Sequence, residues 1–190
     1  MSQRHLIWAA TIVGVIVTAL AYAFSPTLIG GAIAATRDSA RFSGLVFALA
    51  LVARASRPAL LARNKAGLTL AFVAAHGVHF GTIIARAAIE PGNPLGHFAL
   101  QNVLVLGFGF GITGVIAFTA RAKSRPGSRT NAVAFYIVWA LFAVAFGASF
   151  RTSPASAVML IVVVGGILWR VAAAFVPASR ATAAAASSQT

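Results

Sequence analysis

Cysteine and acidic side chains are the scarcest features of this chain. Its 190 residues contain no cysteine, and Asp38 and Glu90 are its only acids. Without cysteine, the chain cannot form a disulfide, an iron–sulfur cluster or a thiolate metal site. Charged residues make up 9% of the chain, against about 25% in a typical soluble domain. Hydrophobic residues make up 59%, and the two values together predict a polytopic helical membrane protein.

The net charge of +13 is explained first by the membrane topology. Most lysines and arginines flank long apolar runs, as the positive-inside rule describes. The same charges attract anionic lipid, so membrane lipid is an expected partner. No basic face or recognition motif stands apart from the apolar runs, and nucleic acid is therefore not expected as a partner.

Six apolar runs are predicted to be transmembrane helices of one all-α bundle, a single domain over residues 1–178. They cover residues 6–24, 40–56, 66–86, 97–120, 132–150 and 155–176. Residues 27–36 are expected to connect the first two helices, and residues 179–190 to form a disordered tail. A cleaved signal peptide is the alternative for the first run, although this run exceeds the usual apolar region of about 7–15 residues.

Loop charge predicts the orientation of the bundle. The loops after the second and fourth runs each carry four lysines or arginines, within residues 54–65 and 121–129. The other three loops carry one apiece, when Arg86 at the end of the third run is counted with the loop that follows it. The protein is expected in the inner (plasma) membrane of the cell. The two basic loops and both termini are expected on its cytoplasmic side. Because all connections are short, consecutive helices are expected to be antiparallel neighbours.

Four glycines in the fourth run are predicted to allow close approach between helices. They are not spaced as a phosphate-binding loop, and no strand precedes them. These residues are Gly107, Gly109, Gly111 and Gly114.

Two histidines, His76 and His79, lie inside the third apolar run, at residues 68–84. An ionisable side chain within a membrane span usually faces the bundle interior and has a partner or a function. A spacing of three places both on nearly one face of a helix. Such a pair cannot hold one haem iron from opposite sides, but either residue can supply one axial ligand. Gly77 and Gly81 are expected to leave room for a flat macrocycle.

Two polar residues of the next run, His97 and Gln101, are further candidates for this site. They begin a helix that descends from the outer interface, so with His79 they are expected to converge in the outer half of the membrane. Two other interpretations remain open. The polar groups can simply form hydrogen bonds between helices, and a divalent metal site is a weaker possibility because no carboxylate or cysteine lies at a matching depth.

Six segments follow one another within roughly residues 37–150. These are residues 41–44 (RFSG), 45–52, 57–58 (RP), 63–68 (RNKAGL), 76–80 (HGVHF) and 114–120. In this order they resemble the ferric-reductase-like transmembrane domain family. The resemblance implies a haem b membrane protein in which His79, before Phe80, is the ligand to the haem iron and His76 is the less certain one. It also implies passage of electrons across the membrane to an external acceptor, as the membrane subunit of an oxidoreductase.

One departure from the family pattern concerns the opposing haem ligand. The family places it on the helix after the second basic loop, and residues 132–150 contain no histidine. Three alternatives follow: His97 replaces it, the haem iron is five-coordinate, or the haem is lost. No flavin or nicotinamide domain is evident, so a separate flavoprotein or a quinone is the expected electron donor. A haem-free scaffold or partner-binding subunit is the alternative function, and a small permease that uses His76, His79 and Gln101 is a weaker one.

Overall fold

The computed structural model describes residues 2–55, 63–89, 100–121 and 129–175, and every structural statement below concerns these residues. Secondary structure in this part of the chain is α-helical, which confirms the all-α class. The helices are α1 (Gln3–Ala23), α2 (Leu28–Ala55), α4 (Lys65–Ile89), α6 (Leu100–Arg121), α7 (Arg129–Ser149) and α8 (Pro154–Phe175).

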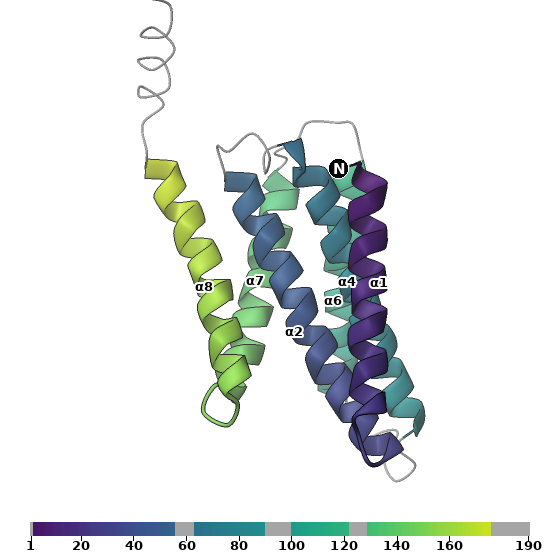
Figure 1. The fold of residues 1–190 in the computed structure, drawn as a ribbon. Coiled ribbons are helices and arrows are strands. Elements are labelled where there is room, and N and C mark those ends of the chain that lie inside the picture. The colour runs from purple at the N-terminus through teal and green to yellow at the C-terminus, as the bar shows by residue number, and fades with distance from the viewer. Residues whose placement is uncertain (1, 56–62, 90–99, 122–128, 176–190) are drawn as a thin grey trace, which may run out of the picture.

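The six helices form a ring of five with the sixth on its outside. Helices α2, α4, α6, α7 and α8 each contact their neighbours in that order, and α8 closes the ring against α2. Helix α1 packs on the outer side, against α2 and α4. Figure 1 shows that the chain alternates in direction, so that α1 begins and α8 ends at the same end of the bundle. We call this the N-terminal end. Consecutive helices are therefore antiparallel neighbours, as short connections imply.

Four helices are long and apolar enough to cross a membrane, which makes this a multi-pass membrane protein. They are Gln3–Ala23, Lys65–Ile89, Ala132–Ser149 and Pro154–Ala173, and α6 adds a shorter apolar stretch, Gly107–Ala120. Large apolar side chains cover the outer surface, for example Phe118 and Ile161, 76% and 71% exposed. Such a surface suits contact with lipid. Helix α2 differs from these four because charged residues Arg37, Asp38 and Arg41 lie within it; that all six helices are spans stays a prediction.

Helix α2 begins twelve residues earlier than expected, since it starts at Leu28 and the predicted span started at residue 40. The expected connection at residues 27–36 is thus almost entirely helical. Two local features explain the difference. The Thr27 hydroxyl accepts a hydrogen bond from the Gly30 N–H (3.0 Å), which caps the new helix. Gly31 lets α2 start against α1, because a Cβ at this position would lie 2.6 Å from the Tyr22 ring.

The glycines of α6 do not act together as predicted. A Cβ added to Gly109 would lie 3.3 Å from Phe80 of α4, so this glycine does bring two helices close. A Cβ at Gly107, Gly111 or Gly114 would meet nothing within 4 Å, and all three residues are exposed. For these three the prediction was wrong. Small residues permit close packing, but a packing partner must also lie on the same face.

Phenylalanine side chains fill the interior of the ring. Phe47 of α2, Phe72 of α4 and Phe135 of α7 are each completely buried. The Phe47 ring centroid lies 5.1 Å from that of Phe72 and 5.6 Å from that of Phe135, within the usual range for paired aromatic rings. The three rings join α2, α4 and α7 across the bundle and hold the ring of helices together.

Candidate functional site

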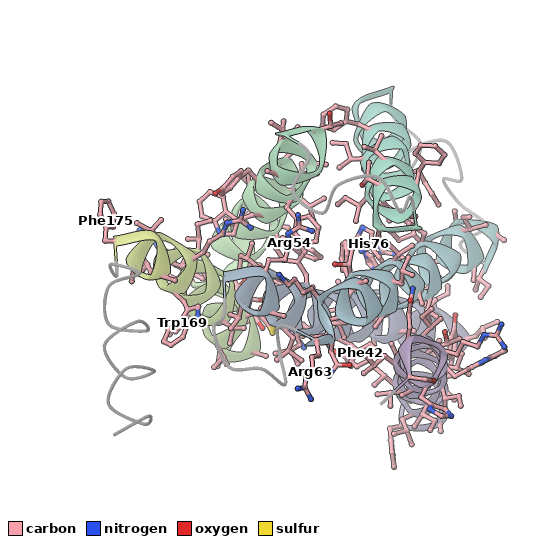
Figure 2. The ribbon with its side chains drawn as sticks, turned by 90° about the horizontal axis from the view of Figure 1, so that it is seen from above. Phe42, Arg54, Arg63, His76, Trp169 and Phe175 are labelled. Carbon is pink, nitrogen blue, oxygen red and sulfur yellow. The ribbon has the colours of Figure 1, made fainter. Side chains whose placement is uncertain are left out.

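Helix α4 directs His76 and His79 toward α2, where two serines meet them. His76 Nδ1 lies 2.8 Å from Ser43 Oγ, and His79 Nδ1 lies 3.1 Å from Ser39 Oγ. The helices are antiparallel, so the earlier histidine meets the later serine. The imidazole centroids are 5.6 Å apart, which confirms that both residues lie on nearly one face of α4. Figure 2 shows His76 pointing inward from α4.

The hydrogen-bond contacts around His79 favour a proton on its Nδ1 nitrogen. Ser39 Oγ lies 3.0 Å from Thr82 Oγ1, and the Thr82 hydroxyl donates to the His79 carbonyl oxygen at 2.6 Å. A closed ring uses one hydrogen for each contact: His79 Nδ1–H donates to Ser39, Ser39 to Thr82, and Thr82 to the His79 carbonyl. If Nδ1 carried no hydrogen, Ser39 would have to donate to it, and one contact of the ring would lack a hydrogen.

The same tautomer follows if the Ser39 hydroxyl uses its other acceptor, the Thr36 carbonyl oxygen at 3.1 Å. Ser39 is then again an acceptor from His79 Nδ1–H. With the proton on Nδ1, the lone pair of Nε2 is available to another partner. The hydroxyl contact of His79 with Ser39 is made at Nδ1. Metal-binding histidines have this arrangement, because a second partner on the far nitrogen orients the ring and fixes its tautomer.

His76 has a more crowded environment. Its ring packs against Phe80 and Phe72 of its own helix, with centroids at 4.4 and 5.3 Å. Phe142 of α7 approaches from across the bundle, with its centroid at 5.6 Å. In contrast, the described ring contacts of His79 are with His76 and Phe80 of its own helix. Phenylalanine thus faces His76 at the level where an opposing ligand from α7 would have to come.

The expectation that Gly77 and Gly81 make room beside the histidines was wrong. At about 100° per residue, they lie about 100° and 140° around α4 from His76. Both are exposed, and a Cβ at either position would meet nothing within 4 Å. They lie on the outer face of the bundle, so they provide no space for a macrocycle in its interior.

The other candidate residues are not brought to the site by the described structure. His97 lies outside the described residues. Gln101 belongs to the first turn of α6, but its side chain is not among those described. In the part of the chain that the structure describes, no three histidine or acidic side chains gather as a metal site would require. Of the four predicted site residues, the structure therefore brings together His76 and His79.

Sequence reasoning missed the hydroxyl groups that hold the histidines. Ser39 and Ser43 are four residues apart and 1% and 0% exposed, and Thr82 is 5% exposed. Two serines spaced by four lie on one face of a helix, and this spacing was a usable signal. It could not show which neighbouring helix they face.

Comparisons with models of protein families, with curated proteins and with solved structures found no match.

Proposed function

We propose that this protein is a membrane electron-transfer subunit that holds haem b through His79 and passes electrons to an external acceptor. The observation that carries the proposal is the closed hydrogen-bond ring of His79, Ser39 and Thr82. It presents Nε2 as a free ligand from a rigid wall of two helices. The resemblance of residues 37–150 to ferric-reductase-like membrane domains supports the same assignment.

The donor set fits a haem iron at His79 better than at His76. Both imidazoles are held at Nδ1 by a serine, as an iron ligand requires at its far nitrogen. Phe142 of α7 packs against His76, whereas the described ring contacts of His79 come from α4 alone. A haem at this position would have one histidine ligand from the described residues, because α7 contains no histidine.

When bound, haem b supplies an iron that gains and loses single electrons. The chain's own residues do the remaining work. Ser39 and Thr82 keep the His79 ring from turning, and they hold its proton on Nδ1. Phe72 and Phe142 exclude water from the interior beside His76. This dry interior argues against a permease, which needs a polar path for its solute.

We infer the orientation and the partners from charge and composition. Arg54, Arg63 and Lys65 lie toward the N-terminal end of the bundle, and a cytoplasmic position for that end of an inner-membrane protein satisfies the positive-inside rule. His79 then lies nearer the outer side, toward an external acceptor protein. The proposed electron donor is a separate flavoprotein or a quinone.

The test is an absorption spectrum of the purified protein, reduced minus oxidised, with haem counted by its pyridine haemochrome. We expect a b-type spectrum that His79→Ala lowers by about tenfold or more per protein. His5→Ala is the matched control, because His5 is exposed on the first turn of α1 and forms its described side-chain hydrogen bond with Ser2. A parent protein that is colourless after expression with ample haem contradicts the proposal, as does an equal haem content in His79→Ala.

A haem-free scaffold is the second candidate, and one observation favours it. Phe142 of α7 packs against His76, at the position where an opposing haem ligand from α7 would have to lie. In that case the histidine–serine pairs serve only to join α2 and α4. This alternative would be established by two results together. The parent protein is stable and colourless, and the parent and the His79→Ala variant capture a partner membrane protein equally well.

A further inference from the structure

Two arginines lie at the N-terminal end of the bundle, each over an aromatic ring of α7. Arg54, in the last turn of α2, places its guanidinium carbon 4.4 Å from the centroid of Phe135. Arg170 of α8 lies 5.0 Å from the centroid of the next residue, Tyr136. Figure 2 shows Arg54 pointing from α2 into the ring of helices. Consecutive residues of one helix thus each carry a guanidinium group over the ring, and the two groups are near enough for the charge of Arg170 to act on Arg54.

Among the described residues, no acidic side chain neutralises this pair. The chain has two acids, and Asp38 binds Arg41 at 2.8 Å in the first half of α2, far along the helix from Arg54. Glu90 follows Ile89, the last residue of α4, which is at the opposite end of that helix from Lys65. The charge of Arg170 acts on Arg54 as a repulsion. Two positive charges are therefore held together without a side-chain counter-ion.

Arg170 also has a buried donor that nothing satisfies. Its Nη1 atom is inaccessible to solvent and has no hydrogen-bond partner among the described residues. A buried, charged donor without an acceptor is costly, and an arginine that stays charged needs an anion or a strong acceptor. The two aromatic rings lower this cost through cation–π contact, but they accept none of the hydrogen bonds.

We propose that Arg54 and Arg170 form a binding site for a phosphate group, supplied by the headgroup of an anionic phospholipid or as free phosphate. Guanidinium groups form paired hydrogen bonds to phosphate oxygens, and two of them neutralise its charge. The site lies in the last turn of α2 and little more than a turn before the end of α8, the level at which a membrane helix meets lipid headgroups.

This site is separate from the histidines. Between Arg54 and His76 lie Phe135, Phe47 and Phe72 in unbroken contact, with successive ring centroids 5.1–5.6 Å apart. All three phenylalanines are completely buried. The phosphate site shares none of its residues with the histidine site, so it does not depend on the proposed function.

The experiment measures phospholipid retention and thermal stability on the full chain in a neutral maltoside detergent. Native mass spectrometry counts bound phosphatidylglycerol against phosphatidylcholine at equal concentration, and the midpoint of thermal unfolding is followed with each lipid and with inorganic phosphate. The variants are Arg54→Gln and Arg170→Gln. Arg4→Gln is the matched control, because Arg4 is exposed on α1 at the same end of the bundle and loses the same charge.

We expect the parent to retain phosphatidylglycerol at least about tenfold better than phosphatidylcholine. Each site variant should weaken this binding about tenfold, equivalent to about 1.4 kcal/mol, while Arg4→Gln leaves it within twofold. Without lipid, the site variants should unfold at an equal or higher temperature than the parent, since they relieve a repulsion. Stabilisation of the parent by inorganic phosphate as well identifies free phosphate as a ligand, and stabilisation by the lipid alone identifies the headgroup.

Equal retention of the two lipids by the parent, with no stabilisation by phosphate, overturns the proposal without any variant. It is overturned equally if Arg170→Gln and Arg54→Gln behave as Arg4→Gln does. Should one glutamine variant fail to fold, Arg170→Lys keeps the charge and loses the paired hydrogen bonds, so its phosphatidylglycerol binding must still fall.

Discussion

Replacement of Ser39 by alanine tests whether the hydrogen-bond ring of His79 is an energetic unit. The substitution removes the partner of His79 Nδ1 and of Thr82 Oγ1, at a site that is 1% exposed. Hydrogen bonds between membrane helices contribute about 0.6 kcal/mol on average and up to about 1.7 kcal/mol. Leaving a buried donor unsatisfied costs about 1–3 kcal/mol. We therefore expect Ser39→Ala to lower the free energy of unfolding by about 1–3 kcal/mol.

A double-mutant cycle separates this ring from the general effect of removing a hydroxyl. Unfolding is measured in mixed micelles for Ser39→Ala, His79→Ala and the double variant. The coupling between the two sites is expected at about 0.6–1.7 kcal/mol. The cross pair, Ser39→Ala with His76→Ala, is the control, because His76 bonds to Ser43 instead. A coupling near zero for Ser39 and His79, or an equal coupling for the cross pair, would refute the argument.

The same variants report on the proposed haem. If Ser39 orients the iron ligand, Ser39→Ala should lower haem affinity about 10–100-fold, as loss of such a second partner typically does. Ser43→Ala should leave haem affinity unchanged, because its histidine is not the proposed ligand. The assay is haem titration of the apoprotein at 25 °C. Equal losses for the two serine variants would remove the distinction drawn between His79 and His76.

Two further substitutions test the packing. Phe47→Ala should destabilise the protein by about 3–5 kcal/mol because it empties a completely buried site, while Phe118→Ala, at an exposed position, should change unfolding in mixed micelles little. Gly31→Ala should destabilise the protein by about 1–3 kcal/mol, since its Cβ would lie 2.6 Å from the Tyr22 ring. Its control is Gly77→Ala, which places a Cβ in open space and should be neutral or stabilising. The packing argument fails if either control costs as much as its buried counterpart.

Most helix positions were predictable from the sequence, and the main error has a local cause. The predicted spans at residues 66–86 and 155–176 agree closely with α4 (Lys65–Ile89) and α8 (Pro154–Phe175). The beginning of α2 was missed because the glycines within residues 27–36 suggested a connection. Thr27 was in fact a capping signal, and Gly31 a contact with Tyr22 of α1. The first could have been recognised from the sequence, but the second could not.

The candidate site was predicted in part. His76 and His79 stood out because an imidazole within an apolar run needs a partner or a function. Gly77 and Gly81 were assigned to the same site from their proximity in sequence, although a step of about 100° per residue turns them to the outer face. Ser39 and Ser43 were overlooked, since hydroxyls in a helix usually bond their own backbone.

By itself, the sequence determined the class of this protein and the number and positions of most of its helices. This is possible because a chain in lipid must satisfy its backbone hydrogen bonds within each segment, and apolar length alone then selects helices. Only the tertiary structure decided that Ser39 holds His79 and that Arg54 and Arg170 meet over α7. Such contacts depend on the rotation and register of one helix against another, which arise from packing across the whole bundle and not from the spacing within any one segment.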